Sequence, residues 1–303
     1  MRALARPALL ALIAAAPTSA LAHGGAHDPL APFGWTWDPA IVFPLFLALL
    51  LFATGWGRLH ARSKRGTRGL RRRAVLFGLG WAILAGALVS PLHQGGEHSF
   101  ALHMIEHELL MLAAAPLLVL SRPLAIILWA WPAPARHFLG RASVWPAVAT
   151  VWRCLTKPIT ATLLQAAALW LWHMPTLFDL ALAHDRWHVA QHLSFIISAL
   201  LFWTATLDND GAPAQRAVSA MCLFATSVVS GALGALMAMS TSPWYQGYAR
   251  LGLAPLGLTP AEDQQIAGLI MWVPGGLVHA MAALVLIRGL LSSRGSEGRF
   301  HAV

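Results

Sequence analysis

Residues 102–108 read LHMIEHE and open an apolar run that continues to Leu120. The histidines in this stretch, His103 and His107, are four residues apart, so on an α-helix their side chains point the same way, about 40° apart around the axis. A polar pair inside a hydrophobic span needs partners, because an imidazole surrounded by hydrocarbon is costly without them. This stretch therefore predicts a membrane helix whose first turns carry part of a polar site.

The composition supports a membrane protein. The chain has 303 residues, of which 57% are hydrophobic and 11% charged, too few charges to cover a soluble globule of this size. Several apolar runs approach the roughly 20 residues that cross a bilayer as a helix. We therefore expect an all-α bundle of seven transmembrane helices within residues 39–290. The runs are 39–58, 74–92, 101–121, 159–175, 186–206, 215–239 and 264–288.

Basic residues predict the orientation of this bundle. The loop from Arg58 to Arg73 holds eight cations, and cationic loops stay in the cytoplasm. Alternating outward from it, seventeen of the 21 Lys and Arg residues fall on the cytoplasmic side and two on the outer side. The prediction is an outer N-terminus and a cytoplasmic C-terminal tail over residues 291–303. The net charge of +9 thus reflects membrane topology, and no nucleic-acid partner is expected.

The N-terminal residues resemble a secretory signal. Residues 1–22 pass from a basic start through an apolar segment to small residues. Cleavage after them would leave a periplasmic tail, 23–38, beginning at His23 with His27 four residues on. A free α-amine beside an imidazole can chelate copper, and a mobile polar tail is the alternative interpretation. The apolar, proline-rich loop 122–158 is expected along the inner membrane surface, with a re-entrant element as the alternative.

Five histidines fall at one predicted depth. His103 and His107 lie in the first two turns of the third span, and His188 and His192 lie in the same turns of the fifth. His173 ends the fourth span, which runs in the opposite direction. At about 1.5 Å per residue, the two pairs lie roughly 3–10 Å inside the same membrane boundary. A lone intramembrane histidine more often makes a helix-to-helix hydrogen bond, but five at one level predict a shared metal site.

The neighbouring residues favour monovalent copper. Imidazole binds zinc, copper, iron and nickel, whereas thioether sulfur favours Cu(I). Met104 and Met111 lie close to the first histidine pair as candidate ligands. Neutral ligands around a monovalent ion leave only one buried charge, which Glu106 is placed to offset or to relay through a histidine Nδ1–H. Haem and other metals stay open as alternatives.

The seventh span begins with a second polar group. Asp263 and Gln264 enter the membrane there, after Thr259 and Pro260, which are typical of a helix start. They are predicted to support the metal site or to dock a partner, and an exposed helix N-terminus is the alternative. His279 lies too deep to join the other histidines and is predicted to pack between helices.

Enzyme signatures are missing from the sequence. His107-Glu108 is not followed by the second histidine of an HExxH motif, and no GxSxG elbow or phosphate-binding loop occurs. The two cysteines, Cys154 and Cys222, form no CxxC motif. The sequence therefore predicts a protein that is not an enzyme.

These motifs together resemble the CtaG family of bacterial cytochrome c oxidase assembly factors over roughly residues 40–290. The resemblance rests on His103-Met104, His107, Leu110-Met111, the run Ala114–Leu120 before Arg122-Pro123, Leu171–Pro175, Phe178-Asp179, Ala181-Leu182, His188, His192, Leu201–Trp203, Asp263–Gln265 and Gly268–Trp272. The family's histidines correspond to His103, His107, His173, His188 and His192, and its polar seventh-helix motif to Asp263 and Gln264.

The resemblance implies a seven-helix protein of the bacterial plasma membrane that helps to build the copper centre of a haem–copper oxidase, and the charge count predicts its metal site near the periplasmic face. Its implied role is that of a copper chaperone, which receives Cu(I) from a periplasmic donor and delivers it to a haem–copper oxidase subunit. Two other functions stay open for the same histidines, namely a copper permease and a membrane redox protein with haem or a di-iron centre.

Overall fold

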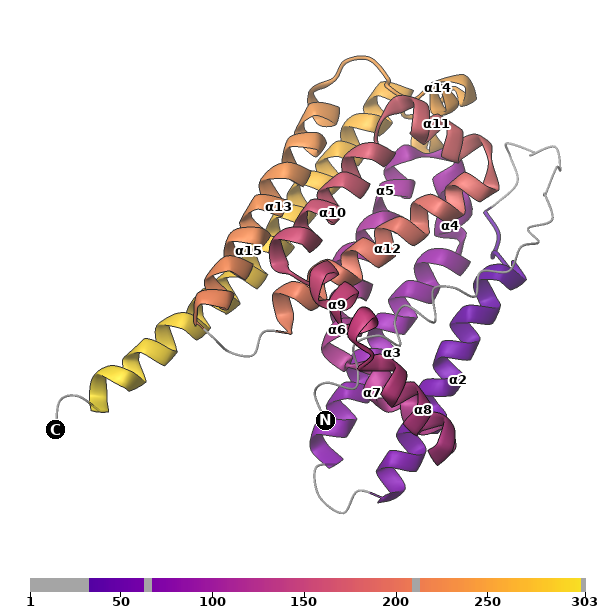
Figure 1. Ribbon diagram of the computed structural model, residues 1–303. Helices are drawn as coiled ribbons and strands as arrows, with labels where there is room; N and C mark the ends of the chain where they lie inside the picture. Colours follow the sequence, from indigo (N-terminus) through magenta and orange to yellow (C-terminus); the bar gives the residue numbers. More distant parts are fainter. Residues whose placement is uncertain (1–32, 63–66, 209–212, 301–303) are drawn as a thin grey trace. The chain divides into compact units, whose positions relative to one another are not determined.

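The computed structural model describes residues 33–62, 67–208 and 213–300, and the elements in these ranges are helical (Figure 1). The predicted signal segment and the proposed chelate of His23 and His27 lie outside the described residues. The all-helical prediction is confirmed for the part of the chain that the structure describes.

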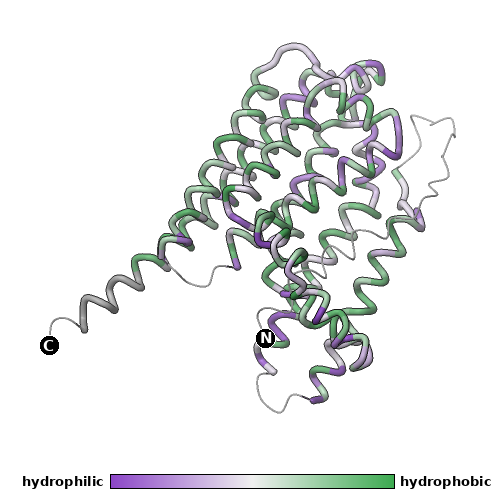
Figure 2. Tube along the Cα trace, viewed as in Figure 1, coloured by the Kyte–Doolittle hydropathy of each residue, from purple (hydrophilic) through white to green (hydrophobic). Residues whose placement is uncertain are grey.

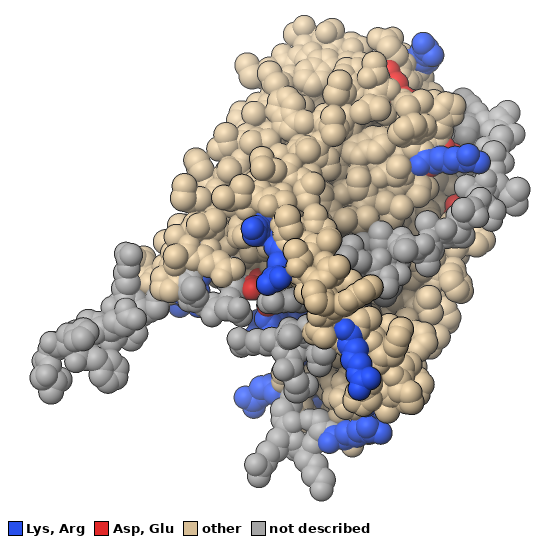
Figure 3. Space-filling model, viewed as in Figure 1, with Lys and Arg blue, Asp and Glu red and all other residues tan. Residues whose placement is uncertain are grey.

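Among the described residues, six helices are long and apolar enough to cross a membrane. Most of their length is coloured as hydrophobic in Figure 2, and the face shown in Figure 3 carries few charged side chains. The protein is therefore a multi-pass membrane protein, and its orientation stays a prediction. The six are α2 (Pro39–Arg62), α3 (Thr67–Val89), the continuous run Phe100–Ser121, α12 (Asp185–Leu207), α13 (Pro213–Met239) and α15 (Pro260–Phe300, apolar to Leu291).

The expected fourth span is a bent pair of helices. Helix α10 (Pro158–Trp172) and helix α11 (Pro175–Ala183) meet at an angle of 74°. Pro175 forces the residue before it out of the helical region, and Met174 is extended at φ −63° and ψ 129°. The span count is thus six, or seven with this pair, and His173 lies at the break.

The run Phe100–Ser121 consists of α5 (Phe100–Glu108), a π-helix η2 (Leu109–Ala114) and α6 (Ala115–Ser121). The proline-rich loop that follows folds into short helices, each beginning at or beside a proline or continuing the one before it. These are α7 (Pro123–Ile127), η3 (Leu128–Ala130), α8 (Ala133–Ser143) and α9 (Pro146–Leu155). Each is too short to span a bilayer. The other short helices are α4 (Pro91–His98), α14 (Gln246–Leu251) and η4 (Pro255–Gly257).

The chain forms two compact units. One ends at Gln94 and resumes over Ala113–Leu155, while the other holds Gly95–Leu112 and the chain from Thr156 onward. In the first unit, Phe52 of α2 stacks on Phe77 of α3 with ring centroids 3.7 Å apart. The second unit contains all five histidines of the predicted metal site.

Helices α13 and α15 lie side by side in the second unit (Figure 1) and meet through glycine. A Cβ atom added to Gly268 would lie 2.5 Å from the carbonyl oxygen of Gly234 and 2.6 Å from the backbone nitrogen of Ala238. Small residues let membrane helices approach this closely, and the gain is van der Waals contact between backbones. Gly268 therefore sets the distance between α13 and α15.

The first turn of α5 is held by α15. Asp263 is buried, and its carboxylate accepts hydrogen bonds from the Ser99 hydroxyl (2.8 Å) and from the backbone N–H groups of Phe100 (2.6 Å) and Ala101 (3.3 Å). The first N–H groups of a helix have no partner within it, so a carboxylate there satisfies them and favours the helix dipole. Asp263 thus positions the turn on which His103 stands.

Gly268→Ala tests the helix contact. The added methyl group meets backbone atoms, so the helices must separate, and we expect a loss of about 1–3 kcal/mol. The melting temperature of the purified protein in detergent should fall by several degrees. Gly276→Ala is the control, because its nearest neighbour is the Ser227 hydroxyl at 3.7 Å and it should be neutral or slightly stabilising. Equal melting temperatures for the two variants would contradict the proposed contact.

Asp263→Ala tests the capping carboxylate. Three donors lose their acceptor in a buried place, which we expect to cost about 1–3 kcal/mol, read as a lower melting temperature. The control is Asp38→Ala, because Asp38 accepts one N–H, that of Ala40, at the partly exposed start of α2. A smaller effect at Asp263 than at Asp38 would show that the buried cap is not a main support of α5.

Candidate metal centre

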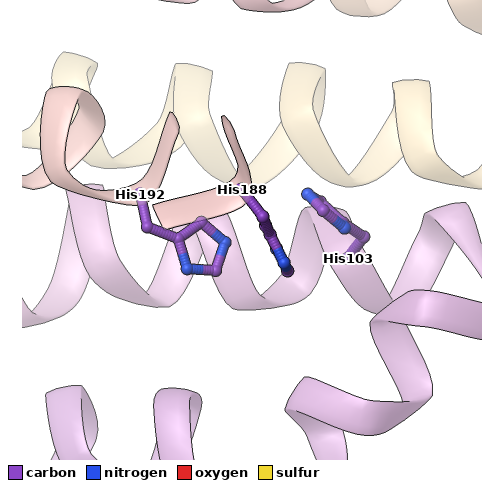
Figure 4. Close-up of side chains that lie close together, drawn as sticks. All are labelled: His103, His188 and His192. Carbon is purple, nitrogen blue, oxygen red and sulfur yellow. The ribbon is translucent and has the colours of Figure 1, made fainter. Parts of the chain in front are cut away.

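Three histidine rings from two helices converge in the second unit (Figure 4). His103 of α5 and His188 and His192 of α12 each offer one ring nitrogen, and these three atoms lie within 4.8 Å of one another. His103 is buried, with 2% of its surface exposed, whereas His188 and His192 are half-buried. The group is the right type and size to hold a metal ion.

His107 lies against this group. Its ring centroid is 4.2 Å from that of His103 and 5.0 Å from that of His192. His107 is buried, and neither ring nitrogen has a hydrogen-bond partner among the described residues. Buried polar atoms in native proteins are almost always satisfied, so both nitrogens are placed for a ligand or an ordered water.

His173 reaches the cluster from the break between α10 and α11. Its Nδ1–H donates to the Leu169 carbonyl at 2.7 Å, so Nε2 carries the lone pair, and Nε2 is buried without a hydrogen-bond partner among the described residues. The His173 ring contacts Phe178 and Phe195, each at 6.1 Å. The same phenylalanines contact His103 (5.2 Å) and His107 (4.7 Å). His173 therefore borders the cluster across two aromatic rings and is not part of its closest group.

Tyr248 of α14 fixes the tautomer of His103. Its hydroxyl donates to the Gly96 carbonyl at 2.5 Å and lies 3.2 Å from His103 Nδ1. A phenol has one hydrogen, so His103 must donate its Nδ1–H to the phenol oxygen, which leaves the lone pair on Nε2. Burial raises the pKa of Tyr248 well above its usual value, and the charges of Asp263 and Glu106 act in the same direction. The phenol consequently stays protonated at neutral pH.

Asp179 holds α14 in place. Its carboxylate accepts the backbone N–H groups of Gln246 (3.1 Å) and Gly247 (3.0 Å) at the start of that short helix. Tyr245, just before α14, donates its hydroxyl to the carbonyl of His173 at 3.1 Å. The loop after α13 therefore supports two of the five histidines through two tyrosines.

Glu106 and Met111, both predicted to support the metal site, face different helices. Glu106 is fully buried, and its Oε1 lies 3.8 Å from Nδ1 of His192, close enough for charge compensation. Met104 and Met111 are buried on the same span, and the Met111 sulfur accepts the Gln165 amide N–H at 3.4 Å. The carboxylate thus faces the α12 histidines, while Met111 faces α10.

Gln264 acts on the loop rather than on the histidines. Its Oε1 accepts the Trp244 N–H at 2.6 Å, and its Nε2 donates to the Ser242 carbonyl at 3.3 Å. Asp263 caps α5, as described above. The polar start of α15 therefore positions the elements that carry the histidines, and neither residue is in the closest ligand group.

Sequence reasoning missed Gln191 and Tyr248. Gln191 stands between His188 and His192, is fully buried, and has no hydrogen-bond partner for either amide atom among the described residues. Its position three residues after His188, on the same helix face, was a signal for this place. Tyr248 carried no such signal, because its contact with His103 spans 145 residues.

Comparison with known proteins places the chain in a family. The family described as cytochrome c oxidase caa3 assembly factor matches residues 50–293, a stretch that includes every histidine of the cluster. Two uncharacterized proteins, one of Mycobacterium bovis and one of Mycobacterium tuberculosis, are each 27% identical over 263 residues.

The matched region is 84% of this chain and 39% of each mycobacterial protein, so the chain spans about two fifths of the length of these relatives. No solved structure matches the chain. The resemblance inferred from the histidine motifs is confirmed by the family match over most of the sequence. The chain belongs to the cytochrome c oxidase caa3 assembly factor family.

Proposed function

We propose that this protein is a non-enzymatic copper chaperone, which holds Cu(I) at its histidine cluster and passes it to a cytochrome c oxidase subunit during assembly. The observation that carries the proposal is the convergence of His103, His188 and His192, whose ring nitrogens lie within 4.8 Å of one another inside a membrane bundle. The family description indicates oxidase assembly, and the histidine cluster suggests that a metal ion is what the protein carries.

The geometry suits one ion with nitrogen ligands. Metal–nitrogen bonds of about 2 Å place two ligand nitrogens about 3.3 Å apart in a tetrahedral site and about 4 Å apart in a linear one. The observed limit of 4.8 Å is slightly wider, so small rotations of the rings complete the site. His107 is close enough to supply a fourth nitrogen after a similar rotation.

Charge favours monovalent copper over a divalent ion. The imidazoles are neutral ligands, and the one carboxylate beside them, Glu106, is fully buried. One cation and one carboxylate leave no net charge in the hydrocarbon, whereas a divalent ion would leave an excess positive charge. Cu(I) also accepts the low coordination number that three histidines provide.

Unequal burial of the ligands provides a route for transfer. His188 and His192 are half-buried, while His103 and His107 are almost fully enclosed. A donor or acceptor protein can exchange ligands with the α12 histidines while the α5 histidines keep hold of the ion. By the predicted orientation this exchange faces the periplasm, where the copper donor and the copper-binding part of the oxidase are expected.

The haem alternative fits the rings less well. The imidazoles contact one another with centroids 4.2 to 6.0 Å apart, from the pair His103–His107 to the pair His103–His192. A porphyrin between two histidines needs a wide flat slot, which contacting rings do not leave. A small ion is therefore favoured.

His103→Ala and His188→Ala test the copper site. Each removes one nitrogen of the closest group, and we expect the Cu(I) affinity to fall at least 10- to 100-fold. The measurement is anaerobic competition for Cu(I) against a chromophoric chelator, with the purified protein in detergent. His184→Ala is the control, because His184 is exposed just before α12 and outside the cluster. Unchanged affinity in both site variants would refute the copper proposal.

Tyr248→Phe tests the tautomer of His103. Loss of the phenol oxygen frees the His103 Nδ1–H, so the ring is no longer held with Nε2 toward the cluster, and we expect about a 10-fold weaker Cu(I) affinity in the same competition. Tyr245→Phe is the matched control, because it loses a bond to the His173 backbone and none to an imidazole. An equal loss in both variants would mean that Tyr248 acts on folding alone.

A further inference from the structure

A small cavity lies in the second unit, on the far side of the histidines. Its volume is about 20 Å³, enough for one water molecule or one ion. The residues that line it come from α5, η2, α10, α13 and α15, and they are Glu108, Met111, Leu112, Gln165, Ala166, Leu169, Thr226, Val229, Ser230, Met271, Gly275 and His279. Glu108 directly follows His107, and Met111 of η2 lies about one turn beyond it. On α10, Leu169 and Gln165 lie about one and two turns from His173.

Several buried oxygen atoms of the residues that line this cavity lack a hydrogen-bond partner among the described residues. Glu108 Oε2, Gln165 Oε1 and Thr226 Oγ1 are buried, with no hydrogen-bond partner among the described residues. The orientation of the Gln165 amide is set by its N–H donation to the Met111 sulfur, which leaves Oε1 as the group without a partner. Buried polar atoms without a partner are costly in hydrocarbon, so an occupant that bonds to these atoms would stabilise the cavity.

His279 adds a nitrogen to the same wall. Its Nδ1–H donates to the Gly275 carbonyl at 2.8 Å, so Nε2 carries the lone pair. The ring is held parallel to Trp203, with an interplanar angle of 3° and a centroid distance of 5.7 Å. Gly275 leaves room beside it, since an added Cβ would lie 3.5 Å from Glu108 Oε2. His279 therefore packs between helices, as predicted, and also lines the cavity.

The ligand types select the occupant. A carboxylate, an amide oxygen, an imidazole lone pair and the thioethers of Met111 and Met271 all accept, so the occupant must bring positive charge or hydrogen. One carboxylate balances one positive charge, which favours a monovalent cation inside the bilayer. Thioether and imidazole ligands favour Cu(I) among such ions.

We propose that this cavity is a second Cu(I) site, with Glu108 as the counter-charge and His279 Nε2, Met111 and Met271 as ligands. The choice of ion rests on the copper role proposed above. The two sites share α5, which carries His103 and His107 of the cluster and Glu108 of the cavity, so an ion can move between them by exchanging ligands along this helix.

The π-helix η2 supports this arrangement. It begins directly after Glu108 and contains Met111, and π-helical turns occur frequently at functional sites. The Met111 carbonyl accepts the Trp203 indole N–H at 2.8 Å. Trp203 thus holds both the widened turn that carries Met111 and, through stacking, the ring of His279.

Copper stoichiometry tests the proposal. Anaerobic Cu(I) titration of the full chain in detergent should give two equivalents for the wild type. Glu108→Gln with His279→Phe should give one, retained at the histidine cluster, and His103→Ala with His188→Ala should also give one, retained in the cavity. Glu262→Gln is the control, because Glu262 is a carboxyl group of α15 outside the cavity, and it should keep two equivalents.

Sulfur coordination provides a second readout. In the protein with both His103→Ala and His188→Ala, X-ray absorption of the remaining copper should show scattering from sulfur ligands. Adding Met111→Leu, which conserves the side-chain volume, should reduce this sulfur signal. One equivalent in the wild type, lost in the histidine variant, would overturn the second site and leave the chaperone proposal standing. One equivalent that is lost only in the Glu108 variant would support the cavity and refute the histidine site.

Discussion

The buried carboxylate of Asp263 is the contact on which the site depends. It accepts three hydrogen bonds from the residues that begin α5, and His103 stands at the end of that first turn. The neighbouring Gln264 ties down the loop from which Tyr245 reaches the His173 carbonyl. Two adjacent polar residues at the start of α15 therefore hold two of the three elements that bring histidines together. Membrane helices lack a hydrophobic drive to associate, so such buried polar contacts fix their relative position.

The helices and their polar ends were predictable because both follow local rules. Apolar runs of bilayer length predicted the spans, and the spacing of His103 and His107 placed both rings on one side of a helix. The histidine pair on α12 was found by the same rule, and the structure brings it within reach of His103. The predicted equal depth of the two pairs therefore indicated a contact between helices that are far apart in the sequence, and the structure shows that contact.

The remaining features depend on packing that no local pattern shows. The bend at His173 arises from Pro175, a local signal, but its consequence is that α10 is too short to cross alone. The sequence marked Asp263 as a polar residue at the start of a span. Its role as a cap of α5 could not be predicted, because its partner Ser99 is 164 residues away in the sequence. Tyr248 and the cavity beside Glu108 assemble from distant segments, so only the folded chain reveals that their polar atoms meet.

The two carboxylates of α5 point in opposite directions, so the position of this helix affects two places at once. Glu106 and Glu108 are two residues apart, so their side chains leave the helix about 200° apart around its axis. Glu106 accordingly faces His192 of α12, and Glu108 faces Gly275 of α15. In the two copper sites proposed above, each of these carboxylates is the counter-charge of one monovalent ion, so α5 carries a counter-charge for both. A shift of this helix would misplace both counter-charges at once, which makes its cap by Asp263 a requirement of the site and not only of the fold.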